Sequence, residues 1–244
     1  MRFAKLIPLC LLLWACTPST PLPPIKPGGP EGVARPASAA AEAGGTAAQT
    51  FLSVVATVEP IAEKMCREHR AAQSCNIRIV IDDRPGQPPN AFQTLDAYGR
   101  PVIGFTLSLI AQARNADELA FVLGHEAAHH ILGHIAKQHD RVLAGALVAG
   151  VQAKADGKSK EAVKAAEDRA AMASILTFSQ DFELEADALG AEIAFRAGYD
   201  PIHGSEFFDR LPEPGNGFRS THPGNAKRKA VVKATVKRLI SAQQ

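Results

Sequence analysis

The run His125-Glu126-Ala127-Ala128-His129 places two imidazoles and a carboxylate at a spacing suited to zinc chemistry. In a helix, His125 and His129 are one turn apart, so both rings leave the same face and can bind one ion. Glu126 points about 100° away and is better placed to reach a metal-bound water than the metal. Zinc lowers the pKa of such a water to about 7, so a carboxylate can take its proton. Because short motifs also arise by chance, a third ligand elsewhere in the chain is needed to support a metal site.

A second cluster, Glu183-Leu184-Glu185-Ala186-Asp187, lies in a stretch with helical apolar periodicity. Glu183 and Asp187 are one helical turn apart and therefore share a face. A ligating imidazole needs its other nitrogen held by an acceptor, which fixes the tautomer and raises the basicity of the ring. We expect Glu183 to be the third zinc ligand and Asp187 to accept from His125. Glu185 lies on another face and is expected to be solvated.

The combination of HExxH with the later Glu-Leu-Glu-Ala-Asp resembles the gluzincin metallopeptidases of the type I CAAX prenyl protease and HtpX-like family, in their soluble bacterial lipoprotein branch. Three further stretches are similar to that family over roughly residues 50 to 240. They are its edge strand (Asn90-Ala91-Phe92), the turn after its ligand helix (Gly198-Tyr199-Asp200-Pro201) and its C-terminal signature (Ser220-Thr221-His222-Pro223, with Arg228).

This resemblance implies an α+β fold, a mainly helical zincin-like domain with a small β-sheet beside the HExxH helix. It also implies a metallopeptidase with one zinc ion per chain, held by His125, His129 and Glu183. Three protein ligands leave a position open for water, as catalytic zinc sites require. Glu126 would act as general base and then donate its proton to the leaving amine.

The family pattern further assigns roles to residues outside the two ligand helices. His222 would lie near the metal and stabilise the oxyanion, or close the site as a ligand in a resting form. Arg228 would orient His222 or a site carboxylate. Asn90 and Ala91 would offer main-chain groups from an edge strand, so that an extended peptide could add as a further strand.

The N-terminus is typical of a secretory signal. Charged residues precede a short apolar run, which indicates a signal peptide over residues 1–15 and is too short to span a bilayer. Leu13-Trp14-Ala15-Cys16 resembles a bacterial lipobox, so Cys16 is expected to be lipidated. An ordinary cleaved signal or an uncleaved anchor are the alternatives. Thr17 after the cysteine resembles lipoproteins sorted to the outer membrane.

Composition changes along the remaining chain. Residues 16–48 are rich in Pro, Gly and Ala with few large apolar side chains, which predicts a flexible tether. Residues 49–244 would form the metallopeptidase domain. The net charge of +2 gives no indication of a nucleic-acid partner.

Two cysteines lie within the predicted domain, Cys66 and Cys75. In an exported protein, a pair this close indicates a disulfide that joins the end of one helix to the following strand. Two buried thiols are the alternative. Metal binding by these cysteines is not expected, because HExxH and ExxxD already complete a three-ligand site.

Periodicity predicts the elements that position these residues. The HExxH helix begins after the cap Asn115 and runs to about His134, whose charge would suit the helix end. The apolar stretch 142–151 is too short to cross a bilayer and is expected to pack into the core, with a cover over the active site as the alternative. Further helices are expected at 51–70, 158–174, after Asp200-Pro201 and at 224–242, with strands at 77–81, 90–95 and 101–106.

The predicted function is a zinc-dependent endopeptidase of the bacterial cell envelope, anchored at the periplasmic face of the outer membrane. An edge strand favours extended substrates, so unfolded or misassembled proteins are the expected targets. The alternative is a zinc-binding lipoprotein that acts as a chaperone or assembly factor. Glu126 distinguishes the two, because it is not a ligand and a purely structural site has no evident need for it.

Overall fold

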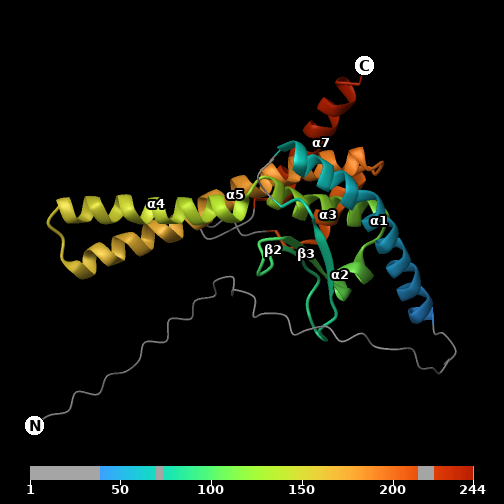
Figure 1. The fold of residues 1–244 in the computed structure, drawn as a ribbon, viewed down its shortest axis with the longest axis horizontal. Helices are drawn as coiled ribbons and strands as arrows, with labels where there is room; N and C mark the ends of the chain where they lie inside the picture. Colours follow the sequence, from blue (N-terminus) through green and yellow to red (C-terminus); the bar gives the residue numbers. More distant parts are fainter. Residues whose placement is uncertain (1–38, 70–73, 214–222, 244) are drawn as a thin grey trace, which may run out of the picture. The chain divides into compact units, whose positions relative to one another are not determined.

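A computed structural model of the chain describes residues 39–69, 74–213 and 223–243. They form a mainly helical domain with one small mixed β-sheet, which confirms the predicted α+β class (Figure 1). The helices are α1 (Ala39–His69), α2 (Leu107–Gln112), α3 (Ala116–Ile131), α4 (His134–Ala155), α5 (Lys160–Arg196), α6 (Pro201–Gly204), the 3-10 helix η1 (Ser205–Arg210) and α7 (Asn225–Ser241).

The sheet contains β1 (Arg78–Asp82), β2 (Ala91–Leu95) and β3 (Pro101–Thr106), in the order β1-β3-β2. The central strand β3 pairs parallel with β1 and antiparallel with β2. All six residues of β3 are buried, as expected for a strand covered on both faces. The strand β2 lies at an edge, and within the described ranges no strand pairs with its outer side.

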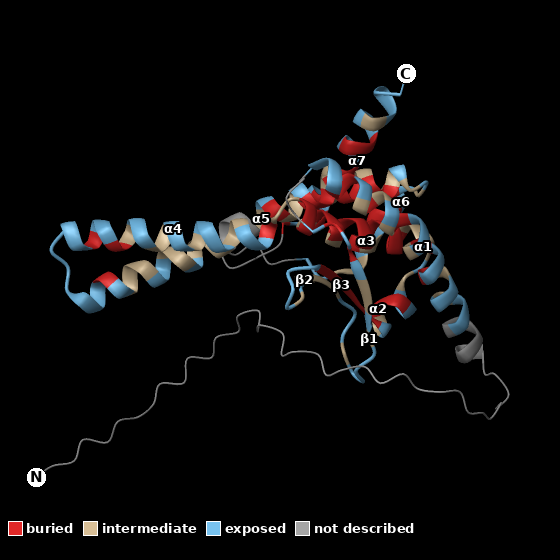
Figure 2. Ribbon diagram, in the orientation of Figure 1, coloured by how far each residue is buried: buried red, intermediate tan, exposed pale blue. Residues whose placement is uncertain are grey.

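Helix α3, which carries HExxH, lies at the centre of the core. Most of its residues are buried, and it contacts α1, α5, α6 and the sheet (Figure 2). Phe121, Leu123 and Ile131 are among the largest fully buried side chains. A helix that is apolar on several faces can be stable only inside a core. The histidines of α3 are therefore presented from a helix held on all sides.

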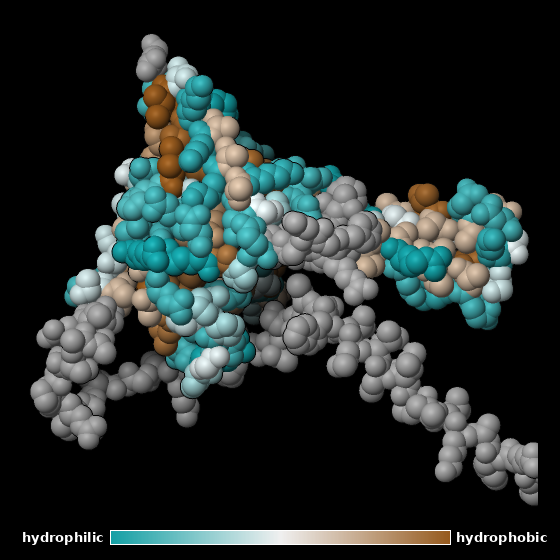
Figure 3. Space-filling model, turned by 180° about the vertical axis from the view of Figure 1, so that it is seen from behind, coloured by the Kyte–Doolittle hydropathy of each residue, from teal (hydrophilic) through white to brown (hydrophobic). Residues whose placement is uncertain are grey.

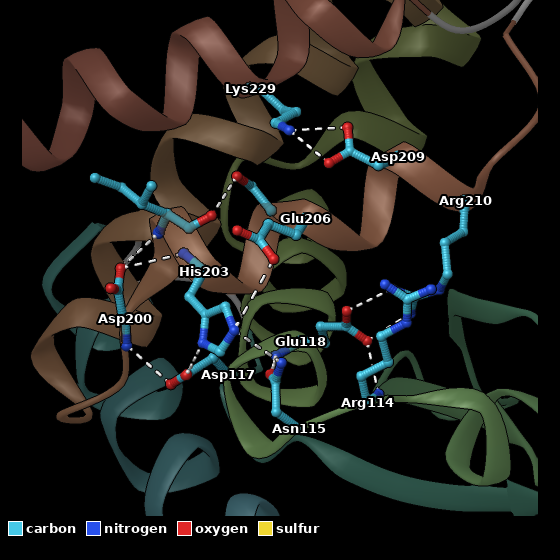
Figure 4. Close-up of polar contacts among 12 residues, drawn as sticks. Arg114, Asn115, Asp117, Glu118, Asp200, His203, Glu206, Asp209, Arg210 and Lys229 are labelled. Carbon is cyan, nitrogen blue, oxygen red and sulfur yellow. Dashed lines mark hydrogen bonds and ion pairs between the residues drawn. The ribbon is translucent and has the colours of Figure 1, made fainter.

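The first turn of α3 is fixed by polar contacts with residues distant in sequence (Figure 4). The Asn115 side chain caps the helix by accepting from the main-chain N–H of Glu118, 2.9 Å away. Glu118 is 1% exposed, and both of its carboxylate oxygens accept from the guanidinium of Arg210 in η1. Asp117 pairs with His203 Nδ1 at 2.9 Å, a partner that the sequence pattern did not suggest. These contacts tie α3 to α6 and η1.

Helices α4 and α5 pack against each other as a hairpin that turns at Gly157 (Figure 1). Small residues of α4 face α5, since a Cβ on Gly145 would lie 2.4 Å from Ser174 Oγ and one on Gly150 would lie 2.3 Å from Glu167 Oε1. The larger apolar residues Leu143, Leu147, Val148 and Val151 are 56–70% exposed on the other side of α4.

The expected core packing of 142–151 is therefore wrong. One face of α4 covers α5, and Gly145 and Gly150 lie on it, whereas Leu143, Leu147, Val148 and Val151 are exposed. The surface of the hairpin is accordingly a mixture of hydrophobic and hydrophilic residues (Figure 3). None of the helices in the described part of the chain combines the length and apolar character needed to span a bilayer.

Helix α1 begins at Ala39, so residues 39–48 of the predicted tether are helical. The segment contains several alanines, the residue with the highest helix propensity, and it extends a helix whose later turns are packed in the core. At the other end of α1, Cys66 and Cys75 form a disulfide, as predicted.

Candidate metal centre

The three predicted zinc donors converge between α3 and α5. The Nε2 atoms of His125 and His129 are 3.1 Å apart. The carboxylate oxygens of Glu183 lie 3.6 Å from His125 Nε2 and 3.5 Å from His129 Nε2. All three donor atoms lie within 4.8 Å of one another. One cation can therefore contact all three residues.

Two glycines bring the helices close enough for this arrangement. A Cβ on Gly124 would lie 2.6 Å from the main-chain oxygen of Gly190, and a Cβ on Gly190 would lie 2.7 Å from the main-chain nitrogen of His125. The helices α3 and α5 are thus in main-chain contact beside the first metal histidine, an approach that only glycine allows. The sequence motifs gave no sign of this crossing.

His125 is oriented by a buried charge pair. Its Nδ1 lies 3.0 Å from Asp187 Oδ1, and Arg228 of α7 donates to both Asp187 oxygens at 2.8 and 2.7 Å. Burial alone would raise the pKa of Asp187, but the hydrogen bonds from His125 and Arg228 lower it. For His125, burial opposes the charged form, yet Asp187 and Glu183 outweigh it and raise the ring's pKa. Arg228 also lies 3.1 Å from Glu183.

His129 has a partner that the sequence analysis missed. His134 Nδ1 lies 2.8 Å from His129 Nδ1, and His134 Nε2 lies 3.1 Å from Glu185 Oε2. The ring of His134 stacks on Phe182, with centroids 4.4 Å apart. Burial and the neighbouring His129 lower the pKa of His134 to about 3, so the ring is neutral. The expectation of a cationic His134 is wrong. Glu185 is exposed, as expected, and its carboxylate also pairs with His134.

A break in the helix explains this contact. The predicted helix continues to His134, where the ring would point about 140° away from His129. Instead α3 ends at Ile131, and Gly133 takes a left-handed conformation at φ 67°. The chain turns there and α4 starts at His134, which returns the ring to His129. Gly133 was the signal available in the sequence.

Glu126 lies beside the donors and lines a cavity of about 200 Å³. Burial raises the pKa of its carboxylate, while the nearby histidines act in the opposite direction. A carboxyl group with a raised pKa is suited to take up and release a proton near neutral pH. The cavity is also lined by residues of β2, α3, α4 and α5, namely Gln93, His129, His134, Ile135, Gln138, Phe182 and Glu183.

The donor set fits a zinc ion. Two imidazole nitrogens and one carboxylate oxygen are ligands found at catalytic zinc sites. Glu183 is itself a donor, and the carboxylates of Glu126 and Asp187 lie beside the histidine donors, with Arg228 as the cationic partner; negative charge therefore outweighs positive among these four groups. A cation at the three donors would balance this excess.

The two predicted substrate contacts on the edge strand differ: the main-chain groups of Asn90 are engaged within the sheet, whereas those of Ala91 point outward. Asn90 uses both main-chain groups on Thr106: its carbonyl accepts from Thr106 N–H at 3.0 Å, and its N–H donates to Thr106 Oγ1 at 2.9 Å. Asn90 therefore cannot pair with a peptide at the edge. In an antiparallel pair, successive residues direct their main-chain N–H and C=O groups alternately toward the partner strand and away from it. Asn90 points toward β3, so the main-chain groups of Ala91 and Gln93 point away from β3, to the outer side of the sheet.

Two predicted residues, His222 and Cys16, lie outside the described residues. A comparison with curated proteins gives no match. The model of peptidase family M48 matches residues 48–236, which is most of the chain and includes both ligand helices. With His125, His129 and Glu183 as its candidate metal ligands, this chain belongs to peptidase family M48, a family of zinc metallopeptidases.

Proposed function

We propose that this chain is a zinc-dependent endopeptidase that cleaves unfolded or misassembled proteins in the bacterial cell envelope. The observation that carries the proposal is the placement of Glu126 beside the convergent donors His125, His129 and Glu183, in a cavity that opens next to β2. A structural zinc site needs four protein ligands and no adjacent base. Three donors and a base are the parts of a hydrolytic site.

His125 and His129 would hold the zinc ion through Nε2, and Glu183 through its carboxylate. When bound, zinc supplies Lewis-acid activation of water and of the scissile carbonyl. Glu126 takes the proton of the attacking water and then returns it to the nitrogen of the leaving amine. Asp187 holds the Nδ1–H of His125 and keeps Nε2 directed at the donors. By resemblance to the family, His222 would stabilise the oxyanion, or act as a fourth ligand in a resting form.

The edge of β2 supports an extended substrate. Ala91 and Gln93 direct main-chain groups away from β3, and Gln93 also lines the cavity with Glu126 and His129. A peptide that adds as a strand needs free main-chain groups over several residues. Unfolded chains and flexible segments meet this requirement, whereas folded domains do not.

The decisive experiment compares the full chain with Glu126→Gln. We expect one zinc ion per chain in both proteins, and cleavage of unfolded casein by the parent alone, with a loss of at least about 100-fold in the variant. Glu161→Gln is the matched control, because it makes the same change at an exposed position in the first turn of α5.

Three results would contradict the proposal. Casein cleavage retained by Glu126→Gln would exclude Glu126 as the base. Zinc in both proteins with cleavage in neither would favour the binding alternative, a chaperone or assembly factor. Zinc absent from both would remove the metal site itself.

The envelope location is a separate part of the proposal and rests on the N-terminal sequence. We propose that Cys16 is lipidated and tethers the domain to the periplasmic face of the outer membrane. Membrane fractionation of cells that express the parent or Cys16→Ser tests this. We expect the parent in the outer-membrane fraction and the variant in the soluble periplasmic fraction; an unchanged distribution would contradict lipidation at Cys16.

A further inference from the structure

The two metal histidines present the same chemical requirement on their outer nitrogens. When Nε2 of a neutral imidazole binds a metal, Nδ1 carries the proton and needs an acceptor. For His125 the acceptor is Asp187. For His129 the atom at hydrogen-bonding distance is His134 Nδ1, at 2.8 Å.

We propose that His134 is a positioning residue for the zinc site, which accepts a hydrogen bond from His129 Nδ1–H and thereby fixes the orientation and tautomer of that ligand. This inference rests on the metal site of the proposed function. It assigns a role in zinc binding to a residue outside both ligand motifs.

The contacts of His134 are consistent with one tautomer. An imidazole that accepts at Nδ1 carries its proton on Nε2. His134 Nε2 lies 3.1 Å from Glu185 Oε2, a carboxylate that can accept this proton. The hydrogen bonds therefore run in one direction, from His129 to His134 and from His134 to Glu185. The opposite tautomer would place two N–H groups against each other and leave Glu185 facing a lone pair.

The ring plane of His134 is also fixed. Phe182 stacks on one face at 4.4 Å and an interplanar angle of 15°, and the guanidinium of Arg141 lies 4.9 Å from the Phe182 ring. His134 is 4% exposed, so water competes little for its Nδ1. Packing thus holds the acceptor in place before any metal binds, which is the condition for a positioning role.

The test measures zinc affinity of the purified full chain by competition with a chromophoric chelator. His134→Leu removes the acceptor, and His134→Asn keeps an oxygen acceptor near the position of Nδ1. We expect His134→Leu to weaken zinc binding by roughly 10- to 100-fold. His134→Asn should stay close to the parent, as should the control His139→Leu at an exposed position of the same helix.

A parent without zinc affinity would contradict the proposed function, whereas a zinc-binding parent with unchanged affinity in His134→Leu would overturn only this inference. Equal losses in the Leu and Asn variants would also overturn it, because packing would then be the cause.

A second measurement does not depend on a folded Leu variant. The ¹⁵N spectrum of histidine-labelled, zinc-loaded parent should show His134 protonated on Nε2 and not on Nδ1, with the signal assigned by its loss in His134→Asn. A proton on Nδ1 would overturn the proposal.

Discussion

The two metal histidines of α3 are held by partners of opposite character. His125 contacts Asp187, a fully buried carboxylate that is paired with a buried arginine, Arg228. His129 contacts His134, a neutral ring whose outer partner, Glu185, is half exposed. Two nearly equivalent ligands are thus supported by a charge pair inside the core and by a neutral imidazole at the rim of the cavity.

This difference determines how far each support affects the rest of the fold. The pair of Asp187 and Arg228 joins α3, α5 and α7, so the first ligand depends on the packing of three helices. A buried pair that loses one partner leaves an uncompensated charge in the core. The support of His129 joins α3 to His134 at the start of α4, and the charged residue in it, Glu185, is exposed to water. The first support therefore affects folding and zinc binding together, and the second affects mainly zinc binding.

The largest effect is expected from matched carboxylate-to-amide changes on α5. Asp187→Asn removes the charge partner that binds two nitrogens of the Arg228 guanidinium and leaves only Glu183 near it, so it should lower the free energy of unfolding by about 3 kcal/mol. Glu185→Gln is half exposed and should change it by less than about 0.5 kcal/mol. Urea denaturation of the zinc-free proteins measures both. Equal changes would show that the two supports do not differ as described.

An intermediate effect should follow from disturbing both supports at once. In Gly190→Ala the new methyl group meets the main chain of His125, so α5 must shift against α3. Overpacking of this kind costs about 1–3 kcal/mol, and zinc affinity should fall because the donors separate. Thermal denaturation and zinc competition measure the two effects.

The control for this change is Gly45→Ala in α1, where an added Cβ meets nothing within 4 Å. Alanine is the better helix former, so this variant should be equal to the parent or more stable. Destabilisation of both variants to the same extent would argue against a special role of the crossing.

The smallest effect concerns an exposed imidazole–carboxylate pair remote from the metal, His203 with Asp117. The hydrogen bond to Asp117 raises the pKa of His203, so the folded state binds the proton more tightly than the unfolded state. Its contribution to stability is complete below the unfolded pKa and is lost as pH rises through the folded pKa.

The stability difference between the parent and His203→Gln should therefore be larger at pH 5.5 than at pH 8.5, as measured by urea denaturation at the two values. Asp200 and Glu206 also face this ring and act in the same direction. No pH dependence would indicate that the pair is fully screened by water.

Local spacing was sufficient for the parts of the site that lie within one helix. The i, i+4 relation brings His125 to His129 and Glu183 to Asp187 in any regular helix, whatever surrounds it. Strand periodicity likewise located β3, and the spacing of Cys66 and Cys75 located the disulfide.

The remaining features depend on contacts between elements. The turn at Gly133 decides whether His134 reaches His129, and a glycine that favours a helix end does not by itself specify this contact. The exposure of Leu143 and Leu147 depends on which face of α4 meets α5, which the apolar composition of 142–151 does not specify. Whether Asn90 or Gln93 presents its main-chain groups at the open edge depends on how β2 is aligned with β3, and the sequence alone does not give this register.

The contact between Gly124 and Gly190 affects which core substitutions this fold tolerates. At that point the separation of α3 and α5 is set by main-chain atoms, whose size does not vary with sequence. Core side chains elsewhere along the two helices can therefore be exchanged for others of similar volume, and the resulting adjustments fall on the helix ends. The distance between the ligand-bearing turns is then preserved while the surrounding core diverges, as long as the two glycines are kept.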